Sequence, residues 1–230
     1  MSKIEVIRKD NISNIDIVYR AVDGLRSESL LWLDKSKISE SITKYQGNIT
    51  DIEISKVLPD TLKIVVGSAR GLFLTAYKGT SYLVTSNGVF VPYELEEGVP
   101  FLEVHTDAEY DLSIVAYKQI LHPEYVQAAN YLIQKLQDNL LTISIERLDY
   151  YVEERELHVS LKDGPILLFD VFGSLDDQIK KLLIYDKEQT PIMRAGLVYM
   201  DLRVPGKIFS CTTEQEYQCY ANLKRIYTKD

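Results

Sequence analysis

The sequence predicts an α+β protein made of a small N-terminal βααββ module and a larger domain with an antiparallel sheet and two helices. Two observations lead to this prediction. The first third of the chain carries strand-like and helical patterns in the order strand, helix, helix, strand, strand, whereas short strand-like runs separated by turn signals dominate from Leu72 onward. Tyr is also over-used, with 16 residues against 6 Phe. Tyrosine suits strands because its ring can pack against neighbours while its hydroxyl stays solvated.

Periodicity and capping residues predict the first strand and the two helices of the module. Lys3 to Arg8 alternates polar and apolar side chains, as a short strand does. Ser13 or Asn14 can cap the first helix, and Gly24 stands where a helix-terminating glycine belongs. Asp34 can cap the second helix. The apolar stripes are Ile15, Val18, Tyr19 and Val22 in the first helix and Ile38, Ile42 and Tyr45 in the second.

A proline separates the two strand-like arms that close the module. The arms are Ile49 to Leu58 and Thr61 to Val66. Pro59 fixes φ for the second position of a turn from Leu58 to Thr61, and Asp60 suits the third position. The stretch therefore predicts a β-hairpin. The glycines and small residues of Gly67 to Gly71 then predict a joint between two units.

The larger domain is predicted from further strand-like runs and two helix starts. His122-Pro123 opens one helix, and Ser174 with Asp177 forms a capping box for the next. We therefore expect domains at residues 1–70 and 71–210, followed by a tail at 211–230 without an assigned element. The strand-like runs are Leu72–Tyr77, Ser81–Thr85, Val89–Val91, Asp111–Tyr117, Thr142–Val152, Leu157–Leu161, Ile166–Phe169 and Leu197–Arg203.

Charge and hydropathy limit the partners of the chain. Its formal net charge of -8 repels a polyanion, and no run of Lys or Arg exceeds two residues, so we expect no nucleic-acid partner. No stretch approaches the roughly 18 apolar residues of a membrane span. The start also lacks the pattern of a signal peptide. Two alternatives fit: a whole cytoplasmic protein, or a soluble part whose membrane anchor precedes it.

The sequence contains no recognisable catalytic or metal-binding motif. His105, His122 and His158 are far apart, and none has a second His or a local carboxylate at ligand spacing, so we expect solvated or structural histidines. No nucleophile elbow is present. The acidic pairs at 96–97, 153–154 and 176–177 are typical of loops and helix caps. We therefore expect a non-enzymatic protein with no catalytic residue, cofactor or metal.

Two cysteines near the C-terminus have two interpretations. Cys211 and Cys219 lack the C-x-x-C spacing of redox and zinc sites. They are either two inert thiols or a local disulfide that ties the tail. The disulfide requires an oxidising compartment.

The last expected strand of the larger domain has two different faces. Val198, Met200 and Leu202 form an apolar face, which a core contact explains. Tyr199, Asp201 and Arg203 form the other face. This second face is either a solvated surface with a weak Asp–Arg pair or an exposed binding surface.

Three stretches, in their order and spacing, resemble the extracytoplasmic part of the FtsQ/DivIB cell-division proteins. Ile54-Ser-Lys-Val-Leu-Pro-Asp-Thr-Leu-Lys-Ile64 is similar to the hairpin of that family's POTRA domain. Tyr82 to Phe90 is similar to its next hairpin, and Tyr199-Met-Asp-Leu-Arg203 to its Val-Asp-Leu-Arg strand. The resemblance runs from Lys3 to about Phe209. The chain departs from the family at Gly67–Gly71, at Val204, in lacking the anchor helix and in its Tyr-rich tail.

The resemblance implies a non-enzymatic division scaffold that binds FtsB-like and FtsL-like proteins and helps regulate septal peptidoglycan synthesis. A partner strand would add to an exposed sheet edge near the end of the larger domain. The implied location is the extracytoplasmic side of the inner membrane at the division septum, with a single upstream anchor helix. This location favours the disulfide. The implied partner-binding residues are Tyr199, Asp201, Arg203, Val204, Lys207, Ile208 and Phe209.

Two alternatives remain at this point. One is another POTRA-type docking or assembly factor of the cell envelope, which would carry further POTRA repeats or a β-barrel. The other is an envelope enzyme that acts on glycan, which would have a deep cleft lined by carboxylates.

Overall fold

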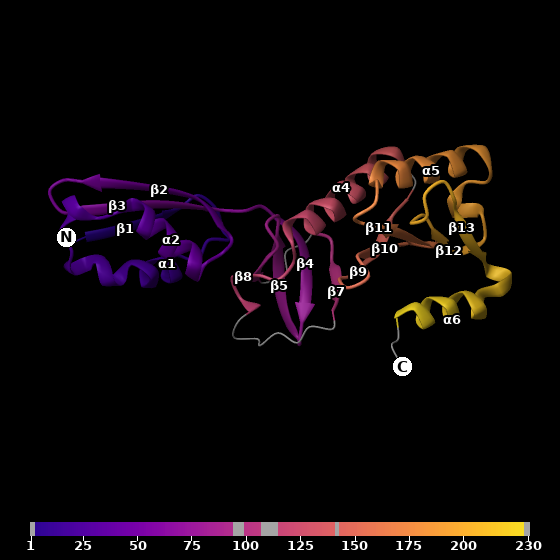
Figure 1. The fold of residues 1–230 in the computed structure, drawn as a ribbon, viewed down its shortest axis with the longest axis horizontal. Coiled ribbons are helices and arrows are strands. Elements are labelled where there is room, and N and C mark those ends of the chain that lie inside the picture. The colour runs from indigo at the N-terminus through magenta and orange to yellow at the C-terminus, as the bar shows by residue number, and fades with distance from the viewer. Residues whose placement is uncertain (1–2, 94–98, 107–114, 141–142, 228–230) are drawn as a thin grey trace. The chain divides into compact units, whose positions relative to one another are not determined.

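The computed structural model describes residues 3–93, 99–106, 115–140 and 143–227. Its contacts divide the chain into two compact units, residues 1–100 with 110–126 and residues 101–109 with 127–230 (Figure 1). The expected α+β class is confirmed. The domain boundaries expected after residues 70 and 210 stay predictions. Within the described residues, no helix is long and apolar enough to cross a membrane.

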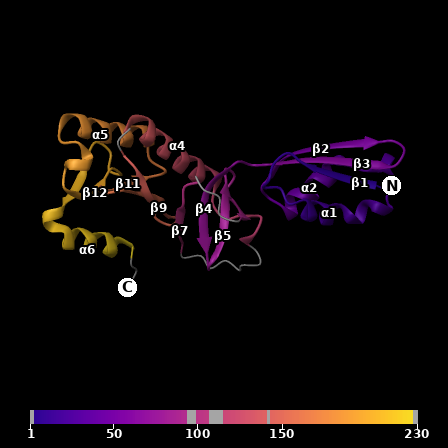
Figure 2. The same ribbon diagram turned by 180° about the vertical axis from the view of Figure 1, so that it is seen from behind.

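The first unit begins with a three-stranded sheet covered on one face by two helices, as Figures 1 and 2 show. The order of its strands is β1-β3-β2, with β1 parallel and β2 antiparallel to β3. Apolar side chains of both helices and all three strands form its core. The elements are β1 (Lys3–Arg8), α1 (Ile15–Val22), the 3-10 helices η1 (Asp23–Ser27) and η2 (Leu30–Trp32), α2 (Lys35–Tyr45), β2 (Ile49–Val57) and β3 (Thr61–Ser68).

Both helices start at side-chain caps, as their sequences predict. Asn14 Oδ1 accepts from the backbone N–H of Asp16 at 3.0 Å, and Asp34 Oδ1 accepts from that of Ser36 at 2.9 Å. Gly24 does not terminate α1 in a left-handed conformation. The chain instead continues into η1, and Gly24 lies inside that turn.

The β2–β3 hairpin is tighter than the expected four-residue turn. Val57 pairs with Thr61, so Leu58, Pro59 and Asp60 alone form the loop, and the Leu58–Pro59 peptide bond is cis. Pro59 therefore lies inside a three-residue loop, because the strand pairing extends one residue further than the turn chemistry predicts.

A four-stranded antiparallel sheet completes the first unit. It comprises β4 (Gly71–Tyr77), β5 (Thr80–Thr85), β6 (Val89–Pro92) and β8 (Lys118–Gln119) in that order. The strand expected at Asp111–Tyr117 is displaced, since Tyr117 has a positive φ of 61° and pairing begins at Lys118. Residues 111–114 and the acidic loop expected at 94–98 lie outside the described residues.

Hydrogen bonds join this sheet to the N-terminal module. The Gly47 N–H donates to the Tyr117 carbonyl at 3.0 Å, and Asn87 Nδ2 donates to the Gly47 carbonyl at 2.9 Å. Lys118 Nζ donates to the Lys44 carbonyl at 2.7 Å. The N-terminal module is therefore bonded to the four-stranded sheet through the end of α2 and the loop after it, as well as through the joint expected at Gly67–Gly71.

The second unit contains a six-stranded sheet in the order β13-β12-β11-β10-β9-β7. It is mixed rather than wholly antiparallel, because β11 pairs with β12 and β7 pairs with β9 in parallel. A helix crosses over between the strands of each parallel pair, as such pairs require. Its elements are β7 (Leu102–His105), β9 (Ile145–Tyr151), β10 (Glu156–Leu161), β11 (Ile166–Asp170), α5 (Leu175–Glu188), β12 (Leu197–Asp201), β13 (Phe209–Thr212) and α6 (Glu216–Tyr227), while α4 (Pro123–Asn139) spans the division between the units.

Two elements occupy the segment that was expected as a tail without an assigned element. It contains the end of β13 and the helix α6, so the described residues after residue 71 include three long helices, α4, α5 and α6, where the sequence predicted two. The mixture of Tyr and charged residues in this segment weakens the periodic pattern. Long-range packing against β12 and β13 stabilises the helix instead.

Gly88 is a position of the first unit where the backbone leaves no room for a side chain. It follows β5 with a φ of +76°, and a Cβ atom built on it would lie 1.8 Å from the Leu121 carbonyl oxygen. We expect Gly88→Ala to lower the free energy of unfolding by about 3 kcal/mol or more, because strain and a backbone clash combine. Urea unfolding followed by circular dichroism measures the loss.

Gly79→Ala is the matched control. Gly79 has a φ of +79°, but no atom lies within 4 Å of its built Cβ. We therefore expect only the backbone cost of about 1–2 kcal/mol. Equal losses for the two variants would contradict the assigned contact between Gly88 and Leu121.

Candidate functional site

The expected partner-binding residues lie on the last two strands of the six-stranded sheet and in the loop between them. β13 pairs with β12 and is the end strand of this sheet in the described part of the chain. Val204 and Phe209 are 38% and 51% exposed, whereas Tyr199, Asp201 and Arg203 are only partly exposed. The fold brings the seven residues together, and the most exposed of them belong to the loop and to β13.

Lys181 holds the loop between β12 and β13. Its Nζ atom, on α5, donates to the backbone carbonyls of Leu202 and Val204 at 2.6 Å each and of Lys207 at 3.0 Å. An ammonium group has three donors, so these bonds use all of them. Burial lowers the pKa of Lys181, against the opposing effect of Asp201 and Asp177. The start of β13 is thereby fixed to α5.

Asp201 and Arg203 form an ion pair that also includes Glu156 of β10. Arg203 Nε donates to Asp201 Oδ1 at 2.9 Å, one terminal nitrogen donates to Asp201 Oδ2 at 2.6 Å, and the other donates to Glu156. The side chains of Arg203, Asp201 and Glu156 are 20%, 14% and 12% exposed, respectively. The sequence left open a weak solvated pair or an exposed binding surface. The pair is largely buried and bidentate, and it links two strands, whereas a role of these residues in partner binding stays a prediction.

Electrostatics in this cluster favour the charged forms. Burial raises the pKa of the Asp201 carboxyl, but the hydrogen bonds from Arg203 outweigh burial and hold that pKa below its usual range. The hydrogen bond with Asp201 raises the pKa of Arg203, with further help from Glu156. The pair therefore stays ionised at neutral pH.

Two of the three histidines lie in a row of side chains that crosses the six-stranded sheet. The His105 ring stacks on Tyr151 with centroids 4.4 Å apart, and Tyr151 lies against His158 at 4.6 Å. His158 Nε2 lies 3.3 Å from a Glu156 carboxylate oxygen. The row thus reaches Arg203 through Glu156. Sequence reasoning missed it because strand register, not local spacing, brings these residues together.

A carboxylate cluster surrounds His105. Its Nε2 atom lies 2.9 Å from Asp149 Oδ1, and Glu103 completes a group whose potential ligand atoms lie within 4.8 Å of one another. The expectation that no histidine has a local carboxylate at ligand spacing is wrong for His105, where Glu103 lies two residues away, and for His158, which contacts Glu156. Asp149 reaches His105 from another strand. β7 pairs with β9, and Asp149 lies 44 residues away in the sequence. Alternation along β7, which places Glu103 and His105 on one face, is the available sequence signal.

Arg147 explains this cluster without a metal ion. Its Nε atom donates to Asp149 Oδ2 at 2.7 Å, so both oxygens of Asp149 have protein partners. Burial raises the pKa of Asp149, but the hydrogen bonds from His105 and Arg147 outweigh it and lower that pKa overall. The guanidinium supplies the positive charge that a cation would bring. His122 lies elsewhere, 3.8 Å from the exposed carboxylate of Glu124.

The two cysteines are joined by a disulfide between β13 and α6. The Cα atoms of Cys211 and Cys219 are 5.8 Å apart. Both side chains are buried and pack with Val198 and Tyr199. The bond ties α6 to the edge of the sheet, where Tyr217 and Tyr220 of α6 remain exposed at 88% and 45%.

Removing Arg203 should destabilise the second unit. We expect Arg203→Gln to lower the free energy of unfolding by about 2 kcal/mol at pH 7, because two largely buried carboxylates lose their counter-charge. Asp201, whose pKa is lowered in the folded state, stabilises the fold above the usual carboxyl pKa of about 4, and this contribution disappears as the pH falls through the lowered value. The difference in the free energy of unfolding between the parent and Arg203→Gln, measured by urea unfolding, should therefore become smaller below about pH 4.

Two matched variants test that explanation. Arg203→Lys keeps the charge but loses the bidentate geometry, so we expect an intermediate loss. Lys180→Gln removes a cation from the exposed surface of α5 and should leave stability unchanged. A loss for Arg203→Gln that is the same at about pH 3, below the usual carboxyl pKa of about 4, as at pH 7 would count against the ion pair.

The disulfide is tested by mass spectrometry, under non-reducing conditions, of protein produced in an oxidising compartment. We expect the intact chain to lack two hydrogen atoms relative to its reduced form and to yield one cross-linked peptide that contains Cys211 and Cys219. The double variant Cys211→Ser/Cys219→Ser should show no such change on reduction. Two free thiols in folded protein produced in this way would refute the bond.

Comparison with known proteins gives a family for the N-terminal module. The sequence model described as "POTRA domain, FtsQ-type" matches residues 1–67. These residues are the β1–β3 module, which the match includes up to the penultimate residue of β3. A search of curated proteins found no match to the chain. The chain thus contains an FtsQ-type POTRA domain, which is consistent with a protein of the FtsQ/DivIB cell-division family.

Proposed function

We propose that the protein is a non-enzymatic scaffold of the bacterial divisome, which binds FtsB-like and FtsL-like proteins and helps regulate septal peptidoglycan synthesis. The FtsQ-type POTRA domain at residues 1–67 is the observation that carries this proposal, since that family consists of non-enzymatic division scaffolds. We further propose that an upstream helix anchors the chain in the inner membrane and holds both units on the extracytoplasmic side, at the septum.

The edge of the six-stranded sheet supports binding by strand addition. β13 has β12 on one side, and its other side is unpaired among the described residues. A partner strand that pairs there gains backbone hydrogen bonds, while side chains at alternate positions give selectivity. Phe209, half exposed at the start of β13, is the largest apolar side chain available on this strand.

The loop before β13 supports a preformed binding edge. Lys181 holds the carbonyls of Leu202, Val204 and Lys207, so the chain that leads into β13 is already ordered. A partner would therefore lose little affinity to ordering this loop. The remaining entropic cost of binding is the cost of ordering the partner strand.

The helix beside the edge supplies aromatic surface. The disulfide attaches α6 to β13, and α6 exposes Tyr217 and Tyr220. Tyrosine is enriched at protein interfaces because its ring packs while its hydroxyl bonds. The proposed contact area thus comprises β13, the Val204–Ile208 segment and the exposed tyrosines of α6.

The two alternatives have less support. Another POTRA-type docking or assembly factor would carry further POTRA repeats, and the family match covers one domain. A glycan-acting enzyme needs a carboxylate that can give or take a proton in a cleft. Glu156 and Asp201 line a hollow beside β12, but both bind Arg203, which disfavours proton transfer by either of them.

Partner binding at β13 is tested with the FtsB and FtsL homologues of the same organism. We expect the parent chain to co-purify with them, and Phe209→Glu to weaken binding at least about tenfold, because a charge replaces an apolar anchor at the edge. Biolayer interferometry with immobilised FtsB–FtsL complex measures the dissociation constant.

Tyr45→Glu is the control for that measurement. Tyr45 is 56% exposed at the end of α2, in the first unit and outside the proposed contact area, so its variant should bind like the parent. Circular dichroism of both variants checks that they fold. Unchanged binding of Phe209→Glu would overturn the proposed edge, and no binding by the parent chain would overturn the scaffold itself.

A further inference from the structure

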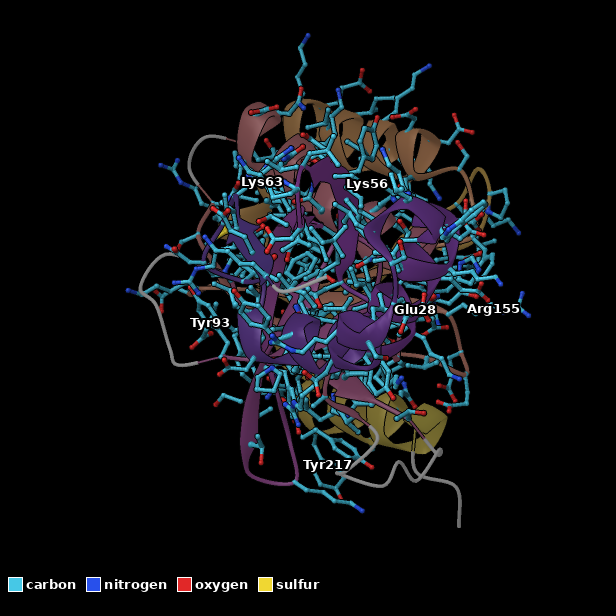
Figure 3. All side chains as sticks on the ribbon, turned by 90° about the vertical axis from the view of Figure 1, so that its left-hand side faces the viewer. Glu28, Lys56, Lys63, Tyr93, Arg155 and Tyr217 are labelled. Carbon is cyan, nitrogen blue, oxygen red and sulfur yellow. A yellow bond between two sulfur atoms is a disulfide. The ribbon has the colours of Figure 1, made fainter. Side chains whose placement is uncertain are left out.

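One end of the POTRA domain exposes a cluster of large apolar side chains. Leu31 and Trp32 of η2 are 71% and 87% exposed, and Val57 and Leu58 at the β2–β3 loop are 47% and 73% exposed. We call these four residues the tip cluster. Figure 3 looks onto this end of the domain, where Lys56 is labelled. Lys56 Nζ donates to the Leu31 carbonyl at 3.0 Å, so the hairpin and η2 are neighbours.

The fold of the domain does not need these side chains. Leu30 and Leu33, which flank the exposed pair in sequence, are each 5% exposed and belong to the core. The short 3-10 turn therefore buries Leu30, and Leu33 after the turn is also buried, while Leu31 and Trp32 are exposed to solvent. Burying a side chain of this size is favourable by roughly 1.5–3 kcal/mol, so the cluster offers binding energy that folding leaves unused.

The start of β1 lies beside the tip cluster. Lys3 pairs with Thr61, and its backbone N–H donates to the Asp60 carbonyl at 3.4 Å, one loop residue after Pro59. Under the proposed function, on which this step rests, the membrane anchor precedes β1. An anchored chain would therefore enter the domain at the end that carries Trp32 and Leu58.

The chemistry of this end suits a lipid surface. Trp is favoured at the boundary between headgroups and acyl chains, where its ring is buried and its N–H stays hydrated. Lys3, Lys35 and Lys56 lie at the same end and can contact phosphate groups, while Asp34 and Asp60 offset part of their charge. Insertion of the apolar side chains, more than attraction of charge, would then supply the binding energy.

We propose that the tip cluster inserts into the headgroup region of the membrane that anchors the protein. This contact would restrain the POTRA domain at the bilayer in addition to the covalent link to the anchor. A second copy of the chain and a protein partner are the other occupants that such a cluster could take. The test below separates them from lipid.

The single Trp of the chain makes the proposal measurable. Trp32 is the only tryptophan in 230 residues, so selectively excited fluorescence reports on the tip cluster alone. The full chain is tethered to phosphatidylglycerol–phosphatidylethanolamine vesicles through an N-terminal or a C-terminal histidine tag and a chelating lipid. With the N-terminal tether we expect a blue shift of emission and quenching by brominated acyl chains. With the C-terminal tether, both the blue shift and the quenching should be smaller.

Two double variants retain Trp32 and test the cluster. Leu31→Ser/Leu58→Ser should lose most of the lipid-dependent quenching. Ile7→Ser/Tyr45→Ser removes two exposed apolar side chains of the same domain, 38% and 56% exposed, and should keep it. Circular dichroism checks that both variants fold. Equal quenching in the two variants, or none with the N-terminal tether, would overturn the proposal.

Two further readouts separate the alternatives. A blue shift that appears without vesicles as the protein concentration rises would assign the cluster to a second copy and overturn the lipid contact. Binding to the FtsB–FtsL complex, measured on the same protein without vesicles, tests the scaffold independently. Intact partner binding without lipid quenching overturns the tip contact alone, and lipid quenching without partner binding overturns the scaffold alone.

Discussion

The edge of the six-stranded sheet depends on a single ammonium group. Lys181 reaches from α5 to three carbonyls of the loop between β12 and β13. Without it these carbonyls would need water or another donor, and the direction in which the chain enters β13 would not be set. The same loop contains Arg203, whose side chain bonds back to Asp201 and Glu156. Helix, loop and strand edge are therefore positioned as one structure.

Local pattern was sufficient to predict the N-terminal module. Its apolar residues recur with strand or helix period, and Asn14 and Asp34 cap the helices. It was insufficient for the second unit. The row from His105 to Arg203 depends on the register of five strands, and α6 depends on a disulfide and on packing against β12. Alternation shows which residues share one face of a strand, but it does not show which strand lies beside it.

The joint at Gly67–Gly71 illustrates the same limit. Two glycines around small residues predict a change of unit, and β3 does give way to β4 there. Gly47 nevertheless bonds with Tyr117 and Asn87, so α2 and the four-stranded sheet are in contact. The composition of Gly67–Gly71 describes only the local backbone of this segment. Whether the chain bends there depends on contacts between residues that are distant in sequence.

The distribution of satisfied and unsatisfied groups explains where a scaffold can bind. Asp149, Asp201 and Glu156 already have cationic partners in the fold, and a docking protein would gain little from groups whose charge is compensated. Unused binding energy resides in the side of β13 that no other described strand pairs with, and in exposed apolar side chains such as Phe209 and Trp32. Backbone pairing and apolar burial tolerate sequence variation better than a fixed set of ion pairs does. Under the proposed scaffold function, contacts of these two kinds would therefore persist while the surface charges of the protein change.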